Sequence, residues 1–202
     1  MYRNTFLSVM FLACCFNGSL CAQSDAQIYE RTCDAKTYPF SDPSPVATPN
    51  NSYYPYFRFD GFSMQAQEKQ WKMVVLENDY VKLTVTPEIG GKIWGAIDKV
   101  YNKEFVYTNG VVKFRDVAMR GPWTSGGIEF NFGIIGHAPT CSTPIDYLTK
   151  KNVDGSVSCH IFSYEWITRT VWNVEINLPK DKAYFTTHTT WFNQSSIDQP
   201  RS

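Results

Sequence analysis

Apolar and polar residues alternate with a period of two along most of the chain from Trp71 onward, which is the pattern of β-strands with one buried face. The clearest run is Thr168–Leu178, where apolar residues from Trp172 to Leu178 recur at every second position and the residues between them are polar. The other strands predicted from this pattern are Trp71–Leu76, Val81–Thr86, Lys92–Ile97, Glu104–Tyr107, Val111–Phe114, Ser156–Tyr164 and Ala183–Phe192.

Short groups of turn-forming residues separate these strands. Glu77–Asp79 connects the first two, and Asn109-Gly110 predicts a tight hairpin between Glu104–Tyr107 and Val111–Phe114. The sequence contains no strong helical pattern longer than two turns. Short strands at this spacing, with turns between them, predict an all-β fold, an antiparallel β-sandwich.

The N-terminal residues 1–22 have the features of a signal peptide. Arg3 provides a positive start, Phe6–Phe16 form an apolar stretch, and small residues up to Ala22 suit cleavage. The apolar stretch is too short to span a bilayer. We therefore predict a secreted or periplasmic protein without a stable membrane span. A lipid anchor is the alternative, because Leu12-Ala13 precedes Cys14.

Residues 23–57 contain turn and linker residues without a periodic apolar pattern, so we expect an extended lead-in to a sandwich domain over residues 58–202. The aromatic run Tyr53–Phe57 is expected to pack on the domain as an edge strand or a strap. The sequence stops soon after the last predicted strand, which would leave an open sheet edge. Two alternatives follow: a short tail covers that edge, or the sequence is the N-terminal part of a longer protein.

The composition of the chain limits the classes of partner and cofactor that we expect. The chain has 19 basic and 19 acidic residues, and no dense cluster of Lys and Arg that could neutralise a row of phosphates, so nucleic acid is not an expected partner. The sequence lacks a Cys/His cluster and a nucleotide-binding glycine motif, so neither a metal nor a cofactor is predicted. Signal-peptide cleavage leaves Cys33, Cys141 and Cys159, and an exported compartment would permit a Cys141–Cys159 disulfide.

Polar and aromatic side chains of the kinds that bind and hydrolyse sugars are concentrated between Arg120 and Tyr147, in a stretch interrupted by glycine and proline. Within it we take Glu129 and His137 as the candidate catalytic residues, a carboxylic acid and a proton-transferring imidazole. Each also has a structural alternative. The glutamate would accept backbone hydrogen bonds in a glycine loop, and the histidine would bond to a backbone carbonyl.

Further residues of this stretch are predicted to bind substrate. Arg120 would clamp hydroxyls or a carboxylate with its planar guanidinium, or instead form an ion pair. Trp123 would stack on a sugar ring, or instead belong to the core. Asn131 and Asp146 complete the predicted substrate-binding set. Glycoside hydrolysis usually needs a second carboxylate. The candidates for it are Asp116, Asp146 and Glu88.

The run Thr86–Ile93, a strand followed by a Gly-Gly turn and a second strand, resembles the opening signature of the galactose-mutarotase-like, or supersandwich, fold. The longer run Gly90–Tyr107, with the blocks Arg120–Phe132 and Gly136–Pro139, resembles a bacterial domain-of-unknown-function family of secreted proteins in that superfamily, whose longer members often carry C-terminal tetratricopeptide repeats. The resemblance covers Trp71–Asn193. It implies a carbohydrate-directed role, and it implies that this chain is an N-terminal part that ends before the glutamate base of mutarotases.

We therefore expect an exported β-sandwich domain that acts on or binds an oligo- or polysaccharide. If it is an enzyme, a glycoside hydrolase or an aldose-epimerase-like activity is expected, with Glu129 and His137 at the reaction centre. The alternatives are a non-catalytic carbohydrate-binding or scaffold domain of a longer protein, and an inactive truncated fragment. The sequence leaves the sugar, the linkage and the oligomeric state open.

Overall fold

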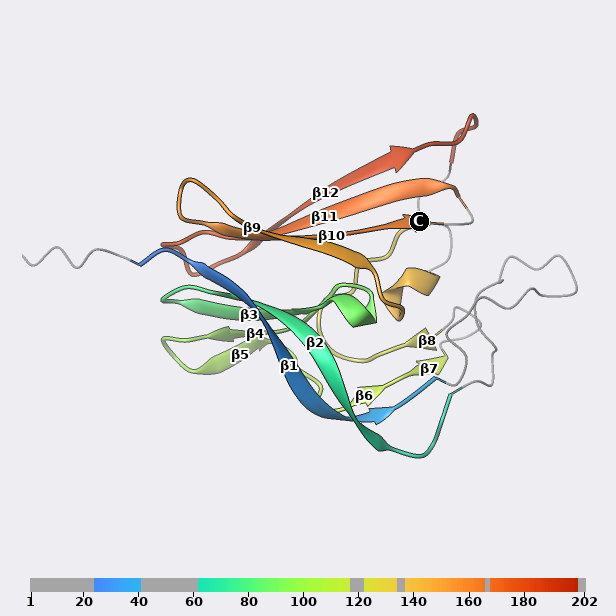
Figure 1. The fold of residues 1–202 in the computed structure, drawn as a ribbon, viewed down its shortest axis with the longest axis horizontal. Helices are drawn as coiled ribbons and strands as arrows, with labels where there is room; N and C mark the ends of the chain where they lie inside the picture. Colours follow the sequence, from blue (N-terminus) through green and yellow to red (C-terminus); the bar gives the residue numbers. More distant parts are fainter. Residues whose placement is uncertain (1–23, 41–61, 117–121, 134–136, 166–167, 200–202) are drawn as a thin grey trace, which may run out of the picture.

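The computed structural model of the protein describes residues 24–40, 62–116, 122–133, 137–165 and 168–199. These residues form an all-β structure in which a six-stranded and a four-stranded sheet face each other (Figure 1). The β-sandwich predicted from the alternating pattern is thereby confirmed. The candidate residue Arg120 and the aromatic run Tyr53–Phe57 lie outside the described residues.

Each of the two sheets takes its strands from one part of the chain. The six-stranded sheet contains β1 (Gln27–Tyr38), β2 (Gln67–Glu77), β3 (Val81–Thr86), β4 (Lys92–Asp98), β5 (Lys103–Val106) and β6 (Val112–Lys113). The four-stranded sheet contains β9 (Asp146–Lys151), β10 (Val157–Glu165), β11 (Thr170–Leu178) and β12 (Thr186–Asn193). The remaining elements are the paired short strands β7 (Arg115–Asp116) and β8 (Pro122–Trp123), and the 3₁₀ turns η1 (Pro87–Ile89) and η2 (Pro139–Cys141).

The predicted turn at Glu77–Asp79 is confirmed, and the Asn78 side chain explains its geometry. Its Oδ1 accepts hydrogen bonds from the amides of Tyr80 and Val81, which closes the turn between β2 and β3. Its Nδ2 donates to the carbonyls of Pro179 and Lys182, in the connection between β11 and β12. One asparagine therefore ties a turn of the first sheet to a turn of the second.

The predicted hairpin at Asn109-Gly110 is wrong. The order of the six-stranded sheet is β5-β4-β3-β2-β1-β6, so the strands on either side of this turn lie at opposite ends of the order. Strand β6 pairs with β1, in parallel. Asn109 does form a local turn, because its Oδ1 accepts from the amide of Val111, but its Nδ2 donates to Ser125 Oγ and so holds the connection to another loop.

Two strands carry little of the apolar alternation that the sequence analysis used. β1 lies in the stretch interpreted as an extended lead-in, yet it pairs with β2 along almost its whole length. Most of its side chains are exposed, so backbone pairing holds it in the sheet and leaves few apolar positions to detect. β9 is exposed in the same way and pairs with β10.

The main core fills the space between the two sheets. Trp172 of β11 is fully buried there, and the ring of Phe132 stacks on it with the ring centroids 4.5 Å apart. The predicted apolar face of this strand is confirmed, since every second residue from Thr170 to Leu178 is buried. A second apolar cluster lies on the other face of the six-stranded sheet, around Trp71, Trp94 and Phe114.

Candidate functional site

The segment 122–133 that carries the candidate residues runs beside the start of β4. Ile128 forms an antiparallel bridge with Ile93, with hydrogen bonds in both directions between their backbones. The tight bend before it requires glycine, because Gly127 has a φ of 69° and an added Cβ would lie 2.3 Å from the carbonyl oxygen of Ile93. Side chains on either side of Ile128 are thereby fixed against β4.

Gly127→Ala is expected to lower the free energy of unfolding by about 2–3 kcal/mol, because alanine combines an unfavourable positive φ with a backbone clash. Urea denaturation followed by tryptophan fluorescence measures the change. Gly110→Ala is the matched control, since an added Cβ at Gly110 meets no atom within 4 Å. Equal stability of the two variants would contradict the role of this bend.

Glu129 is the centre of a polar cluster. Its Oε1 accepts a hydrogen bond from Asn131 Nδ2 at 2.8 Å and lies 2.6 Å from His137 Nδ1. Asn131 is held in turn, because its Oδ1 accepts from the backbone amide of Ala138 at 3.1 Å and from Cys141 Sγ at 2.9 Å. These contacts are made with side chains, so the structure does not show Glu129 as a simple acceptor of backbone amides in the glycine loop.

A buried lysine lies behind this cluster. The Lys92 side chain is 1% exposed, and its Nζ donates to the backbone oxygen and the hydroxyl of Thr124. The same Nζ lies 3.9 Å from Glu129 Oε2, an oxygen that is buried and without a hydrogen bond. Burial lowers the pKa of the Lys92 ammonium, and the negative charge of Glu129 opposes that effect.

Cys33, Cys141 and Cys159 are free thiols, so the disulfide permitted between Cys141 and Cys159 is not formed in this structure. Burial raises the pKa of the Cys141 thiol well above its usual value, and the charge of Glu129 acts in the same direction. Cys141 therefore serves the site as a protonated donor to Asn131.

His137 is the more exposed residue of its pair with Glu129. Its side chain is 23% exposed, against 11% for Glu129, and its ring lies beside Trp123 with centroids 6.0 Å apart. Because Nδ1 is engaged by Glu129, Nε2 is the ring nitrogen left for another partner. An imidazole oriented by a carboxylate in this way can take up or release a proton at Nε2.

The structure brings together four of the sequence-predicted residues: Glu129, His137, Asn131 and Trp123. Asp146 is exposed at the first position of β9, opposite Phe162. Of the other carboxylates considered, Glu88 accepts the backbone amide of Lys72, which is a structural contact, and the Asp116 side chain lies outside the described part.

Sequence reasoning missed Lys92, Thr124 and Cys141. The Gly-Gly-Lys run before Ile93 was the only sequence signal for the lysine. It could not show that the partner, Glu129, lies more than thirty positions further along the chain.

An open cleft of about 560 Å³ adjoins the cluster at Asn131. One wall is the stretch Asn131–Gly133, and the other is His188–Trp191 of β12. The described residues that line it supply aromatic rings, hydroxyls, an amide and an imidazole, and none of them is Asp, Glu, Lys or Arg. We call this hollow the β12 cleft.

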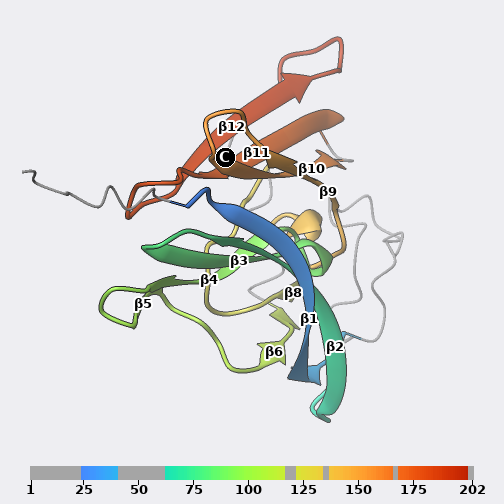
Figure 2. The same cartoon turned by 60° about the vertical axis from the view of Figure 1, so that its left-hand side comes forward.

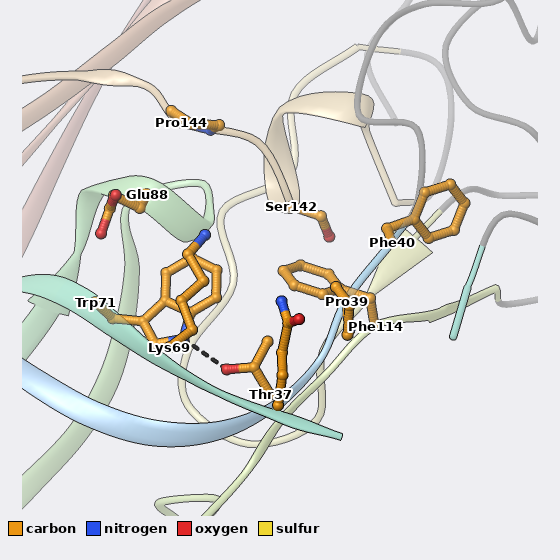
Figure 3. A pocket seen from close by; sticks show the side chains of 10 residues that line it. Thr37, Pro39, Phe40, Lys69, Trp71, Glu88, Phe114, Ser142 and Pro144 are labelled. Carbon is orange, nitrogen blue, oxygen red and sulfur yellow. Dashed lines mark hydrogen bonds between the residues drawn. The ribbon is translucent and has the colours of Figure 1, made fainter. Parts of the chain in front are cut away.

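A smaller cavity of about 210 Å³ opens near the end of β1, on the face of the second apolar cluster (Figure 3). Trp71 and Phe114 form its apolar wall, and Glu88 lies across from Lys69. The ammonium of Lys69 lies over the Trp71 ring, 3.7 Å from the centroid. That face of the indole is therefore already occupied by a side chain of the protein, which makes the cavity a poor stacking site for a sugar.

Within the described ranges, His, Cys, Asp and Glu side chains form no group of three that could hold a metal ion. The same part of the chain contains no helix with the length and hydrophobicity needed to span a membrane.

The fold and the cluster together define an all-β sandwich domain with a carboxylate–imidazole pair beside an uncharged cleft. The family described as "Domain of unknown function (DUF5107)" matches residues 48–201, and the chain belongs to that family. It is also similar to a solved structure described as a TPR-domain containing protein from Parabacteroides distasonis, with 26% sequence identity and a TM-score of 0.72. The similarity covers 84% of this chain and 29% of that chain.

Proposed function

We propose that the protein binds a neutral carbohydrate in the β12 cleft. The observation that carries this proposal is the lining: aromatic rings and uncharged hydrogen-bonding groups face a hollow of about 560 Å³. Ligand sites typically measure roughly 300–1,000 Å³ and combine apolar surface with a few polar groups. An ionic ligand would find no opposite charge among these side chains, whereas a sugar offers hydroxyls and an apolar ring face.

Two residues are central to the proposed binding. Trp191 is half-buried, packs against the main core and lines the cleft, so the part of its indole at the cleft is an apolar surface for a sugar ring. Asn131 uses one Nδ2 hydrogen for Glu129, and an amide group has a second one to donate. The hydroxyl of Thr189, on the same face of the strand as Trp191, can both donate and accept, as sugar hydroxyls require.

Trp191→Ala is expected to weaken binding of neutral oligosaccharides at least about tenfold, because it removes the stacking surface. A glycan array selects the ligand, and isothermal titration calorimetry then measures Kd for the full chain. Phe192→Ala is the matched control, since the next residue on the strand points to the opposite face and Phe192 is 56% exposed. A folded wild-type protein that binds no neutral glycan, or equal losses in the two variants, would contradict the proposal.

A second candidate function is acid–base chemistry on the sugar, favoured by the 2.6 Å contact between Glu129 Oε1 and His137 Nδ1. In this arrangement His137 exchanges the proton through Nε2, and Glu129 orients the ring. Glycoside hydrolysis or sugar epimerisation are the reaction classes that such a group serves. The predicted placement in the galactose-mutarotase-like superfamily and the predicted export of the protein agree with this candidate, and both stay predictions.

If the protein turns over a sugar, His137→Ala is expected to reduce kcat by about a hundredfold or more, the range for loss of an acid–base group. Turnover is measured on the oligosaccharides selected by the array. The control is His160→Ala, which removes a histidine of β10 that contacts Asn173 and Glu175 instead. Activity retained in His137→Ala would exclude His137 as the proton-transferring group.

A further inference from the structure

The smaller cavity beside Trp71 contains one positive and one negative side chain in addition to its apolar wall. Lys69 of β2 supplies the ammonium, and Glu88 of η1 supplies the carboxylate. The ion pairs of the described residues do not join these two side chains to each other. In Figure 3 the ammonium of Lys69 points towards the side of the cavity on which Glu88 and Ser142 lie. The cavity therefore presents two separate, opposite charges to a ligand.

Contacts within the protein hold both charged groups in place. The Lys69 ammonium lies over the Trp71 ring, and the indole is itself held because its Nε1 donates to Thr37 Oγ1 at 2.9 Å. Glu88 Oε2 accepts the backbone amide of Lys72 at 2.6 Å, which leaves Oε1 for another donor. Because the two groups are already positioned, binding of a ligand between them requires little further ordering of side chains.

The wall opposite β2 is formed by η1 and by the segment that follows η2, and backbone contacts join these two pieces. The turns η1 and η2 lie side by side (Figures 1 and 2), so closely that an added Cβ at Gly90 would lie 2.5 Å from the carbonyl oxygen of Thr140. The Gly90 amide donates to the carbonyl of Thr143 at 2.8 Å. The amide of Ile145 donates to the carbonyl of Pro87 at 3.0 Å. Hydrogen-bonded backbone therefore fixes the shape of this wall.

The two charges favour a dipolar ligand. An ion of one sign would be attracted by one of the two side chains and repelled by the other. A neutral sugar would find the face of Trp71 covered by Lys69. A free α-amino acid instead carries an ammonium, a carboxylate and a side chain on one carbon atom. The cavity measures about 210 Å³, below the roughly 300–1,000 Å³ of sites for drug-sized ligands, so it suits a molecule of this small size.

We propose that the smaller cavity binds a free α-amino acid with an apolar side chain. Its ammonium pairs with Glu88, its carboxylate pairs with Lys69, and its side chain packs on the apolar wall formed by Trp71 and Phe114. This site is separate from the β12 cleft and does not depend on carbohydrate binding there. Because the Lys69 side chain is exposed, water and salt screen its charge, so weak binding with a Kd in the high-micromolar to millimolar range is expected.

The test is isothermal titration calorimetry of the full chain with L-alanine, L-leucine and L-phenylalanine at low salt and at about pH 6.5, where an α-amino group is protonated. Leucine is then compared with N-acetyl-leucine, which lacks the ammonium, and with leucinamide, which lacks the carboxylate. Each derivative is expected to bind at least about tenfold more weakly than leucine. Absence of saturable binding for all three amino acids, or equal affinity of leucine and either derivative, would overturn the proposal.

Two substitutions assign each end of the amino acid to its partner. Glu88→Gln keeps an oxygen for the Lys72 amide and is expected to abolish only the preference for leucine over N-acetyl-leucine. Lys69→Met keeps an apolar cover on Trp71 and is expected to abolish only the preference for leucine over leucinamide. The control is Glu68→Gln, on the opposite face of β2 and outside the cavity lining, which should retain both preferences. If Glu88→Gln or Lys69→Met retains both preferences while folded by circular dichroism, the proposal is wrong.

Discussion

Replacing Glu129 with glutamine is expected to lower the free energy of unfolding by about 3–5 kcal/mol, although the two side chains have nearly the same shape. The reason is Lys92, whose side chain is 1% exposed and whose ammonium faces Glu129 Oε2 at 3.9 Å. Glutamine leaves that buried positive charge without its counter-ion. It also removes the charge from the short contact with His137. Urea denaturation of both proteins at neutral pH measures the difference.

A double-mutant cycle separates the ion pair from other effects of the substitution. Lys92→Met alone removes the ammonium and leaves a buried carboxylate, so it is also expected to destabilise the protein. Lys92→Met combined with Glu129→Gln is expected to be clearly less destabilised than the sum of the two single variants, by about 1 kcal/mol or more. If the losses of stability in the two single variants add up to the loss in the double variant, the two charges do not compensate each other. The same conclusion follows if Glu129→Gln alone costs less than about 0.5 kcal/mol.

The second large effect is a loss of stability at alkaline pH that comes from Cys159. Burial between the sheets raises the pKa of this thiol from 9.0 to about 12, and the charge of Glu30 contributes in the same direction. Between these pH values the unfolded chain loses the thiol proton while the folded chain keeps it. The contribution of the Cys159 thiol to the free energy of unfolding is therefore fully present below pH 9 and is lost as the pH rises towards 12. The total loss is about 4 kcal/mol at roughly 1.4 kcal/mol per pH unit.

Urea denaturation at a series of pH values from 8 to 11 measures this slope. Cys159→Ala is expected to be less stable than the wild type at pH 8 and to lose less stability on going to pH 11. Val157→Ala, a truncation two residues earlier on the same buried face of β10, is the control and should retain the full wild-type slope. Lys92 also contributes to the pH dependence, because its lowered pKa makes stability rise with pH below the ordinary value of 10.5. This contribution is the same in all the variants, so it cancels when their slopes are compared. Parallel curves for wild type and Cys159→Ala would contradict the assignment.

The sandwich was predictable because its central strands bury one face against the opposite sheet. In β11 the buried positions alternate strictly with partly exposed ones, and the sequence shows the same alternation of apolar and polar residues. Strands held mainly by backbone pairing lack this alternation, so the sequence analysis did not predict β1 and β9. The partner of a strand is also invisible to local patterns, so the Asn109-Gly110 turn was misread as a hairpin although its strands pair with β4 and β1.

The candidate site was predictable where its members are close in sequence. Glu129, Asn131 and His137 lie within nine positions, and a single irregular segment brings their side chains together. Lys92 reaches the cluster from β4 only because the Ile93–Ile128 bridge aligns the two segments. The β12 cleft could not be predicted from the sequence, because Gly133 and Trp191 are far apart in the chain and line the same hollow only in the folded structure.

The central claim, carbohydrate binding in the β12 cleft, is tested most directly by following backbone amide signals in ¹⁵N NMR spectra while a neutral oligosaccharide is added to the full chain. Binding in the cleft predicts saturable shifts confined mainly to residues 131–133 and 188–191. The signals around Trp71 and Phe114, at the smaller cavity, should stay in place. Saturable shifts at that cavity with none at β12, or no saturable shift with any neutral glycan, would contradict the account.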